Sequence, residues 1–257
     1  MHTKESFINN KFIPIIKIML LLPTKGRYFK NNNIFFNWGL IWDHLSPLII
    51  VIGLALLVTA GIRGRGFDLE YMLFIFLYWF GFTQIISKIV NINFNDFLLS
   101  KNGINRSLII FSFSVIHFSS LFIRFLICYF FMLLFGYELQ LTYLLWSMIL
   151  LSFFGISYGI IIMSIIRHRS FLVDLHGYFL QGMFFLSSII IPVPLLPEPI
   201  RGYLLYNPLV HLFEWIKYPT TGIYYSFIDI NYFLQWLFVL LILAPLFLFK
   251  DQLSSNG

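Results

Sequence analysis

Long apolar runs, separated by short polar connections, dominate the chain. Six of these runs carry almost no charge: 45–62, 71–87, 108–135, 139–166, 177–192 and 230–249. About 20 apolar residues in a helix cross a hydrocarbon core of about 30 Å. A backbone in lipid must satisfy its own hydrogen bonds, so these runs are predicted to be helices. The pattern therefore predicts an all-α membrane protein with six transmembrane helices.

The same pattern divides the chain into three parts. In residues 1–37 apolar side chains alternate with Lys4, Lys11 and Lys17, which is typical of an amphipathic helix lying in the headgroup plane. This arm is either a plain interfacial anchor or a helix that also touches a cytoplasmic partner. Residues 38–249 form the predicted transmembrane domain, with a cytoplasmic loop at 88–107, and 250–257 form a short tail.

The 17 Lys and Arg residues predict the orientation. Twelve of them precede the first run, lie in 88–106 or 167–169, or follow the last run. Four fall on the opposite side, and Arg124 lies inside a run. Because Lys and Arg gather on the cytoplasmic side, both termini are predicted to be cytoplasmic.

Composition agrees with a membrane protein. Hydrophobic residues make up 59% of the 257 residues and charged residues 11%, and the mean hydropathy is +0.85. A soluble domain has about 25% charged residues. The net charge of +6 comes from residues beside the apolar runs and fits membrane lipid, so nucleic acid is not expected as a partner. The lone Cys128 is expected to serve packing.

Region 192–217 interrupts the pattern. Pro192, Pro194, Pro197 and Pro199 are predicted to end the fifth helix, and the chain breaks again at Asn207 and Pro208. The stretch is too apolar for a free loop and too broken to span, which predicts short re-entrant helices buried in protein or lining a cavity. Its aromatic residues are either an interfacial belt or a surface on which sugars stack. They include Tyr203, Tyr206 and Trp215.

His117 and Arg124 are the polar residues of note inside a run. They lie two helical turns apart and so share one face, which should meet protein or water rather than lipid. Contact with an anionic substrate and a structural role both remain open. The sequence has no G-x-x-x-x-G-K-[ST] phosphate loop and no H-E-x-x-H or G-x-S-x-G motif. We therefore expect no catalytic site, metal or bound cofactor on this chain, and an energy source on a partner protein.

Three stretches resemble one family. Gly39, Trp42 and Pro47 are similar to its G-x-x-W-x-x-x-x-P motif, and 185–192 with Pro197 to F-[IL]-S-x-x-x-x-P…P. Residues 203–214 are similar to Y-L-L-x-N-P-L-V-H-x-x-E over twelve positions. The family is that of the permease subunits of type 2 ABC exporters, specifically those that export capsular polysaccharide.

This resemblance implies a homodimer in the bacterial inner membrane, joined to two ABC ATPase subunits that bind ATP and Mg²⁺. Lipid-linked polysaccharide would pass along the dimer interface, with periplasmic and outer-membrane capsule export proteins as further partners. The ATPase-coupling residues would be Asn93, Asn95, Asp96, Phe97, Leu98 and Lys101. The substrate-channel residues would be His117, Arg124, Tyr203, Tyr206, Asn207, His211, Glu214 and Trp215.

Several positions depart from the family pattern. Asn93, Gly103 and Arg106 replace its usual Glu and prolines around the coupling loop, and His117 stands about where the family has a Glu. Three alternatives remain: an ABC permease for O-antigen or teichoic acid, an ABC exporter of small molecules, and a membrane-embedded acyl- or glycosyltransferase. The last would need a titratable pair in a water-accessible site, and the sequence shows none with suitable spacing.

Overall fold

The structure is a computed structural model. It describes residues 38–61, 69–91, 106–137, 139–166, 169–191, 193–221 and 226–255. The predicted arm 1–37 lies outside these residues, and so do the six predicted coupling residues, Asn93, Asn95, Asp96, Phe97, Leu98 and Lys101. Contacts divide the chain into Met1–Pro47 and Leu48–Gly257. The packing described below is that of the second unit.

The described residues form helices and turns, with no strand among them. The helices are α2 (Trp38–Gly61), α3 (Leu69–Val90), α5 (Arg106–Leu134), α6 (Leu141–Ile166), α7 (Ser170–Leu186), the 3₁₀ helix η3 (Val193–Leu195), α8 (Glu198–Leu204), α9 (Pro208–Thr221) and α10 (Ile230–Ser255). The prediction of an all-helical chain is confirmed for this part of the sequence.

Among the described residues, four helices are long and apolar enough to cross a membrane. These spans are Met72–Val90, Ser107–Leu134, Leu141–Ile166 and Ile230–Lys250. Two shorter apolar segments, Ser46–Leu57 and Phe171–Leu186, lie at the places of the first and fifth predicted spans. The protein is therefore a multi-pass membrane protein by length and composition.

The first predicted run, 45–62, lies within α2 up to Gly61, and the helix itself begins earlier, at Trp38, and contains Pro47. One predicted boundary was wrong. The fifth run was predicted as 177–192 and ended by proline, whereas α7 ends at Leu186, before Pro192. The chain leaves the α7 helix at Ser187 and Ser188, and Ser188 has a φ of 60°. A left-handed residue ends a helix as effectively as a proline does.

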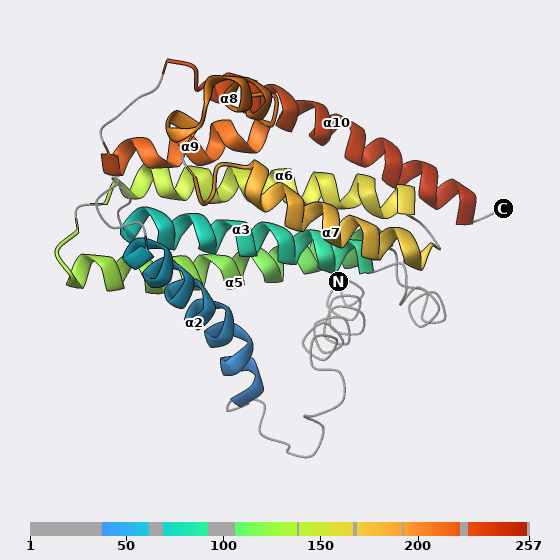
Figure 1. The fold of residues 1–257 in the computed structure, drawn as a ribbon. Helices are drawn as coiled ribbons and strands as arrows, with labels where there is room; N and C mark the ends of the chain where they lie inside the picture. Colours follow the sequence, from blue (N-terminus) through green and yellow to red (C-terminus); the bar gives the residue numbers. More distant parts are fainter. Residues whose placement is uncertain are drawn as a thin grey trace. The chain divides into compact units, whose positions relative to one another are not determined.

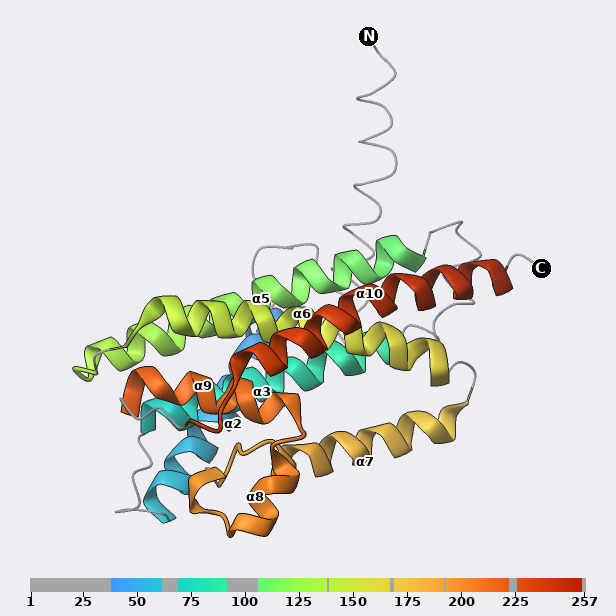
Figure 2. The ribbon, with the colours of Figure 1, turned by 90° about the horizontal axis from the view of Figure 1, so that it is seen from above.

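The helix α3 is the centre of the second unit. It contacts α5, α6, α7 and α9, and α6 in turn contacts α10. Figure 2 shows α5 and α7 on opposite sides of α3, and Figure 1 shows α6 between α3 and α10. In the most apolar stretch of α3, 72% of the residues are buried within the protein, whereas in that of α10 17% are buried. The exposed apolar side chains of α10 suit contact with lipid.

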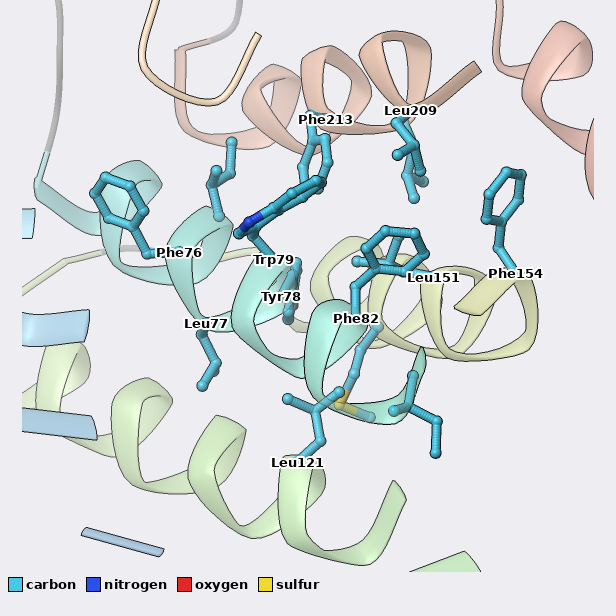
Figure 3. Close-up of a cluster of buried hydrophobic side chains, with 14 of the residues drawn as sticks. Phe76, Leu77, Tyr78, Trp79, Phe82, Leu121, Leu151, Phe154, Leu209 and Phe213 are labelled. Carbon is cyan, nitrogen blue, oxygen red and sulfur yellow. The ribbon is translucent and has the colours of Figure 1, made fainter. Parts of the chain in front are cut away.

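Aromatic side chains fill the space around α3. Trp79 meets Phe213 of α9 with ring centroids 6.2 Å apart, and Phe82 meets Phe154 of α6 at 6.1 Å. Figure 3 shows Trp79 directed toward α9 and Leu77 directed toward α5. This aromatic core holds α3, α6 and α9 together.

Two glycines let α3 and α6 approach closely. A Cβ atom on Gly155 would lie 2.9 Å from Cγ2 of Ile85, and one on Gly159 would lie 3.4 Å from the Cα atom of Ile86. Gly155 and Gly159 form a G-x-x-x-G pair, a spacing that places small residues on one face of a membrane helix. The apolar pattern of the sequence did not single out this pair.

Serine hydroxyls on α5 and α6 bond back to their own helices. Ser114 and Ser119 donate to the carbonyl oxygens of Ile110 and Val115, at 2.8 and 2.9 Å. Ser152 donates to that of Met148 at 2.7 Å. These three serines line an otherwise mainly apolar groove of about 640 Å³ between α5, α6 and α10. Bonding to the i−4 carbonyl satisfies a hydroxyl in an apolar setting.

One buried hydrogen bond joins α3 to the start of α6. The Tyr78 side chain is fully buried, and its hydroxyl donates to the carbonyl oxygen of Leu144 at 2.8 Å. We expect Tyr78→Phe to lower the free energy of unfolding by about 1 kcal/mol, because a buried hydrogen bond is lost. Thermal unfolding of the purified protein in detergent measures this. Tyr203→Phe, at a side chain that is 79% exposed, should leave the melting temperature unchanged.

Candidate functional site

Asn207 caps α9 and ties it to the end of α7. Its Oδ1 accepts the backbone N–H of Leu209 at 3.0 Å, two residues beyond the cap position. Its Nδ2 donates to the carbonyl oxygen of Leu186 at 2.9 Å and to the Ser187 hydroxyl at 3.0 Å. Pro208 then takes the first helical position, where no N–H is needed. The Asn-Pro pair therefore begins a helix and holds the turn after α7.

His211 joins the turn before α9 to the start of α10. Its Nε2–H donates to the carbonyl oxygen of Leu205 at 2.8 Å, and its Nδ1 accepts the backbone N–H of Asp229 at 3.0 Å. These two partners require the neutral ring with the proton on Nε2. The ring also lies 5.0 Å, between centroids, from that of Tyr232. His211 is 4% exposed, so its hydrogen bonds connect two backbone segments inside the protein.

Glu214 is the centre of a buried charged cluster, which we call the Glu214 cluster and which comprises Ser188, Glu214 and Lys217. Glu214 Oε1 accepts hydrogen bonds from the Ser188 hydroxyl and the Lys217 ammonium. It also accepts the backbone N–H of Val193 at 3.1 Å. Lys217 donates to the Ser188 hydroxyl as well, at 3.1 Å. The cluster therefore fixes the Pro-rich stretch after α7 to α9.

Burial governs the charges of this cluster. Glu214 and Lys217 are 4% and 5% exposed. Removal from water lowers the pKa of the Lys217 ammonium, and the charge and hydrogen bond of Glu214 oppose that decrease. Glu214 Oε2 is buried without a hydrogen-bond partner in the described part of the chain. Each group stabilises the charge of the other, because an ion pair offsets part of the cost of burying its charges.

Three of the eight predicted channel residues, Asn207, His211 and Glu214, thus lie together as joints of one compact segment. Val193, Leu204 and Val210 of the same segment form a small apolar cluster. The predicted break at Asn207 and Pro208 is confirmed, because α8 ends at Leu204 and α9 begins at Pro208. Short helices are therefore present where re-entrant helices were predicted.

The predicted aromatic residues have different surroundings. Tyr203 and Tyr206 are 79% and 76% exposed. Trp215 is half-buried and lies 5.0 Å, between ring centroids, from Tyr143 of α6. Tyr206 and Asn207 also border a pocket of about 280 Å³ whose other walls are largely aromatic and come from α3, α6, α7 and α10. Phe82, Phe154, Tyr158, Phe179 and Trp236 contribute rings to it.

His117 and Arg124 lie apart from that segment, on α5. They are 3% and 5% exposed, so their shared face meets protein, which was one of the two expected surroundings. The guanidinium Nη1 of Arg124 donates to Oε1 of Gln84 on α3 at 2.9 Å. His117 borders a small gap beside Gly81 and Ser152. Substrate contact by either residue remains a prediction.

A groove of about 460 Å³ between α3 and α7, with five polar side chains in an otherwise apolar wall, had not been predicted. Its polar side chains are Thr83, Gln84, Ser87, Lys88 and Gln181. The four on α3 follow the spacing i, i+1, i+4 and i+5, which places them on one side of a helix. That spacing was visible in the sequence, but it lies at the end of a run that otherwise reads as uniformly apolar.

Within the described residues no group of three His, Cys, Asp or Glu side chains could hold a metal ion. No protein-family model matches the chain. A search of curated proteins likewise finds no significant match.

Proposed function

We propose that this chain is the membrane permease subunit of an ATP-driven exporter that moves lipid-linked capsular polysaccharide across the bacterial inner membrane. One observation carries the proposal. The twelve-residue stretch 203–214, which resembles the family motif most closely, has a specific partner for each of its polar residues Asn207, His211 and Glu214. Each of these three side chains makes hydrogen bonds that another residue type could not make. The similarity to the family motif is therefore unlike a chance similarity between two apolar sequences.

The proposed topology has six spans. The four long spans would be joined by α2 and α7, and the Lys and Arg bias would place both termini in the cytoplasm. The segment from η3 to α9 would re-enter the outer face of the membrane. Its buried polar bonds support this placement, because backbone and side-chain groups at membrane depth need partners within the protein.

The proposed working unit is a homodimer with two separate ABC ATPase subunits. ATP and Mg²⁺ would bind to those subunits, and this chain would need neither a catalytic site nor a cofactor of its own. The loop that contains Asn93, Asp96 and Lys101 would meet the ATPases together with the N-terminal arm. O-antigen or teichoic acid would use the same arrangement, with a different polymer in the channel.

Deletion of the gene in its native bacterium tests the proposal. We expect surface polymer to disappear, polymer to accumulate inside the cell, and a plasmid copy to restore export. Immunolabelling of intact and of permeabilised cells measures the two pools. Surface polymer that persists without internal accumulation would reject polysaccharide export and favour a small-molecule exporter.

A variant pair makes the same experiment specific to the motif. A copy with Glu214→Gln should restore less export than wild type, because the Glu214 cluster loses its negative charge. Glu198→Gln, at an exposed side chain on α8, is the matched control and should restore export fully. Membrane levels of both variants are compared by immunoblot, so that loss of protein is separated from loss of transport.

A further inference from the structure

The groove between α3 and α7 has five polar side chains in its wall, which is unusual between two apolar helices. Besides its five polar residues it is lined by Trp79, Phe80, Gly177 and Leu180. Thr83 and Gln84 are half-buried, while Ser87, Lys88 and Gln181 are exposed. Amides and ammonium groups on a membrane helix are costly in lipid and therefore usually face water, protein or a ligand. Their concentration in one hollow points to a binding site.

The groups that line the groove suit an anion. Lys88 supplies an ammonium, Gln84 and Gln181 supply amides, and the nine lining residues include no carboxylate. Hydrogen bonds in which one partner is charged are stronger than neutral ones. Phosphate oxygens would accept from these donors, so the set of donors favours a phosphorylated ligand.

Arg124 sets the direction of one donor. Nη1 of Arg124 donates a hydrogen bond to Oε1 of Gln84 at 2.9 Å. The amide of Gln84 is thereby oriented so that its NH₂ group can donate to a ligand in the groove. Arg124 itself is 5% exposed and does not line the groove. It is therefore a positioning residue, which acts on a ligand through Gln84.

Two hydroxyls give the groove one acceptor and one further donor. Thr83 Oγ1 donates to the carbonyl oxygens of Trp79 and Phe80 at 3.1 and 3.2 Å, so its proton is used and its oxygen can accept. Ser87 Oγ already accepts from Nδ2 of Asn91 at 3.3 Å and keeps a hydroxyl proton to donate. A wall with both donors and acceptors matches a ligand that carries hydroxyl groups beside its phosphate.

We propose that this groove binds a phosphate-bearing, hydroxyl-rich headgroup. Its volume of about 460 Å³ lies within the range of small-molecule sites. The natural source, which rests on the proposed function, is the phosphorylated sugar end of the lipid-linked polysaccharide. Under the proposed topology the Lys88 end of α3 faces the cytoplasm, where such a lipid would enter.

Binding by the full-length purified protein in phosphatidylcholine nanodiscs tests the site. The probe is fluorescent phosphatidylinositol, whose headgroup combines a phosphate with a hydroxylated ring, and phosphatidylcholine itself is the zwitterionic reference. We expect saturable binding of phosphatidylinositol, weakened about tenfold by Lys88→Gln and by Gln181→Ala, because each removes a hydrogen bond to the bound headgroup. Lys250→Gln and Gln235→Ala, at exposed positions on α10, are matched controls and should bind as wild type.

Gln84→Glu separates the positioning role from a structural one. The new carboxylate still accepts from Arg124, so the melting temperature should be kept or raised, while the NH₂ donor is lost and a negative charge faces the phosphate. We expect binding to be abolished in a stable protein. Arg124→Ala should weaken binding as well, because the Gln84 amide is then no longer held in one orientation.

Competition with soluble inositol 1-phosphate identifies the source of the ligand. Weak competition assigns the groove to a lipid headgroup, and competition as strong as that of the lipid assigns it to a free sugar phosphate. The proposal is overturned if wild type binds phosphatidylinositol no better than the reference lipid. It is also overturned if the groove variants bind normally but change the monomer–dimer ratio, since the groove would then be a subunit contact. These assays do not involve export, so either result leaves the deletion experiment to be judged separately.

Discussion

Replacing Glu214 by Ala should lower the free energy of unfolding by about 3–5 kcal/mol, the cost of breaking a buried ion pair by removing one partner. The variant removes the Glu214 carboxylate from the Lys217 ammonium, which is 5% exposed. It also removes the acceptor of the Val193 backbone N–H. Chemical denaturation in detergent, followed by tryptophan fluorescence, measures the loss.

Two further variants decide whether the pair itself is responsible. Glu198→Ala removes an exposed carboxylate from α8 and should change the free energy of unfolding by less than about 0.5 kcal/mol. Glu214→Leu combined with Lys217→Met removes both charges and should recover most of the stability lost by Glu214→Ala, because apolar residues can replace a buried pair. A double variant as unstable as the single one would contradict a role for charge and indicate that shape alone matters.

Replacing Gly155 by Leu should prevent α3 and α6 from packing and abolish a folded, monodisperse protein. A Cβ atom added there would lie 2.9 Å from Ile85 and 3.0 Å from Phe82, so a larger side chain must displace these two buried neighbours. Gly155→Ala should be milder, with a loss of about 1–3 kcal/mol from overpacking. Size-exclusion chromatography and melting temperature report both effects.

Gly182 on α7 provides the matched control. No atom lies within 4 Å of a Cβ added there, so Gly182→Leu should fold and melt as the wild type or slightly higher, since leucine favours helix more than glycine does. If Gly155→Leu behaved like Gly182→Leu, the close approach of α3 and α6 would be disproved.

The sequence was sufficient for those features that depend on local pattern. The four long spans follow from the length of their apolar runs, and the break at Asn207 and Pro208 follows from turn chemistry. The end of α7 could not be predicted in this way. It depends on the left-handed Ser188 and on Asn207, which binds the carbonyl oxygen of Leu186 from 21 residues further along the chain.

In the candidate site, too, some features follow from the local sequence and others depend on contacts between distant segments. The motif 203–214 identified Asn207, His211 and Glu214 as special, but only their partners show that they are joints. The groove between α3 and α7 and the link from Arg124 to Gln84 join segments about 40 residues or more apart. Such pairings depend on how helices pack, and an apolar run does not disclose which of its neighbours covers each face.

The serines of α5 and α6 have a mechanical consequence. A hydroxyl that bonds to its own helix forms no polar bond across the groove between α5, α6 and α10, so a change in the separation of α5 and α6 would leave the bonds of Ser114, Ser119 and Ser152 intact. The segment around Glu214 is the opposite case, since any displacement there must break buried bonds. In the proposed export cycle, α5 and α6 would therefore move relative to each other across this groove, and the segment from η3 to α9 would move as a rigid block.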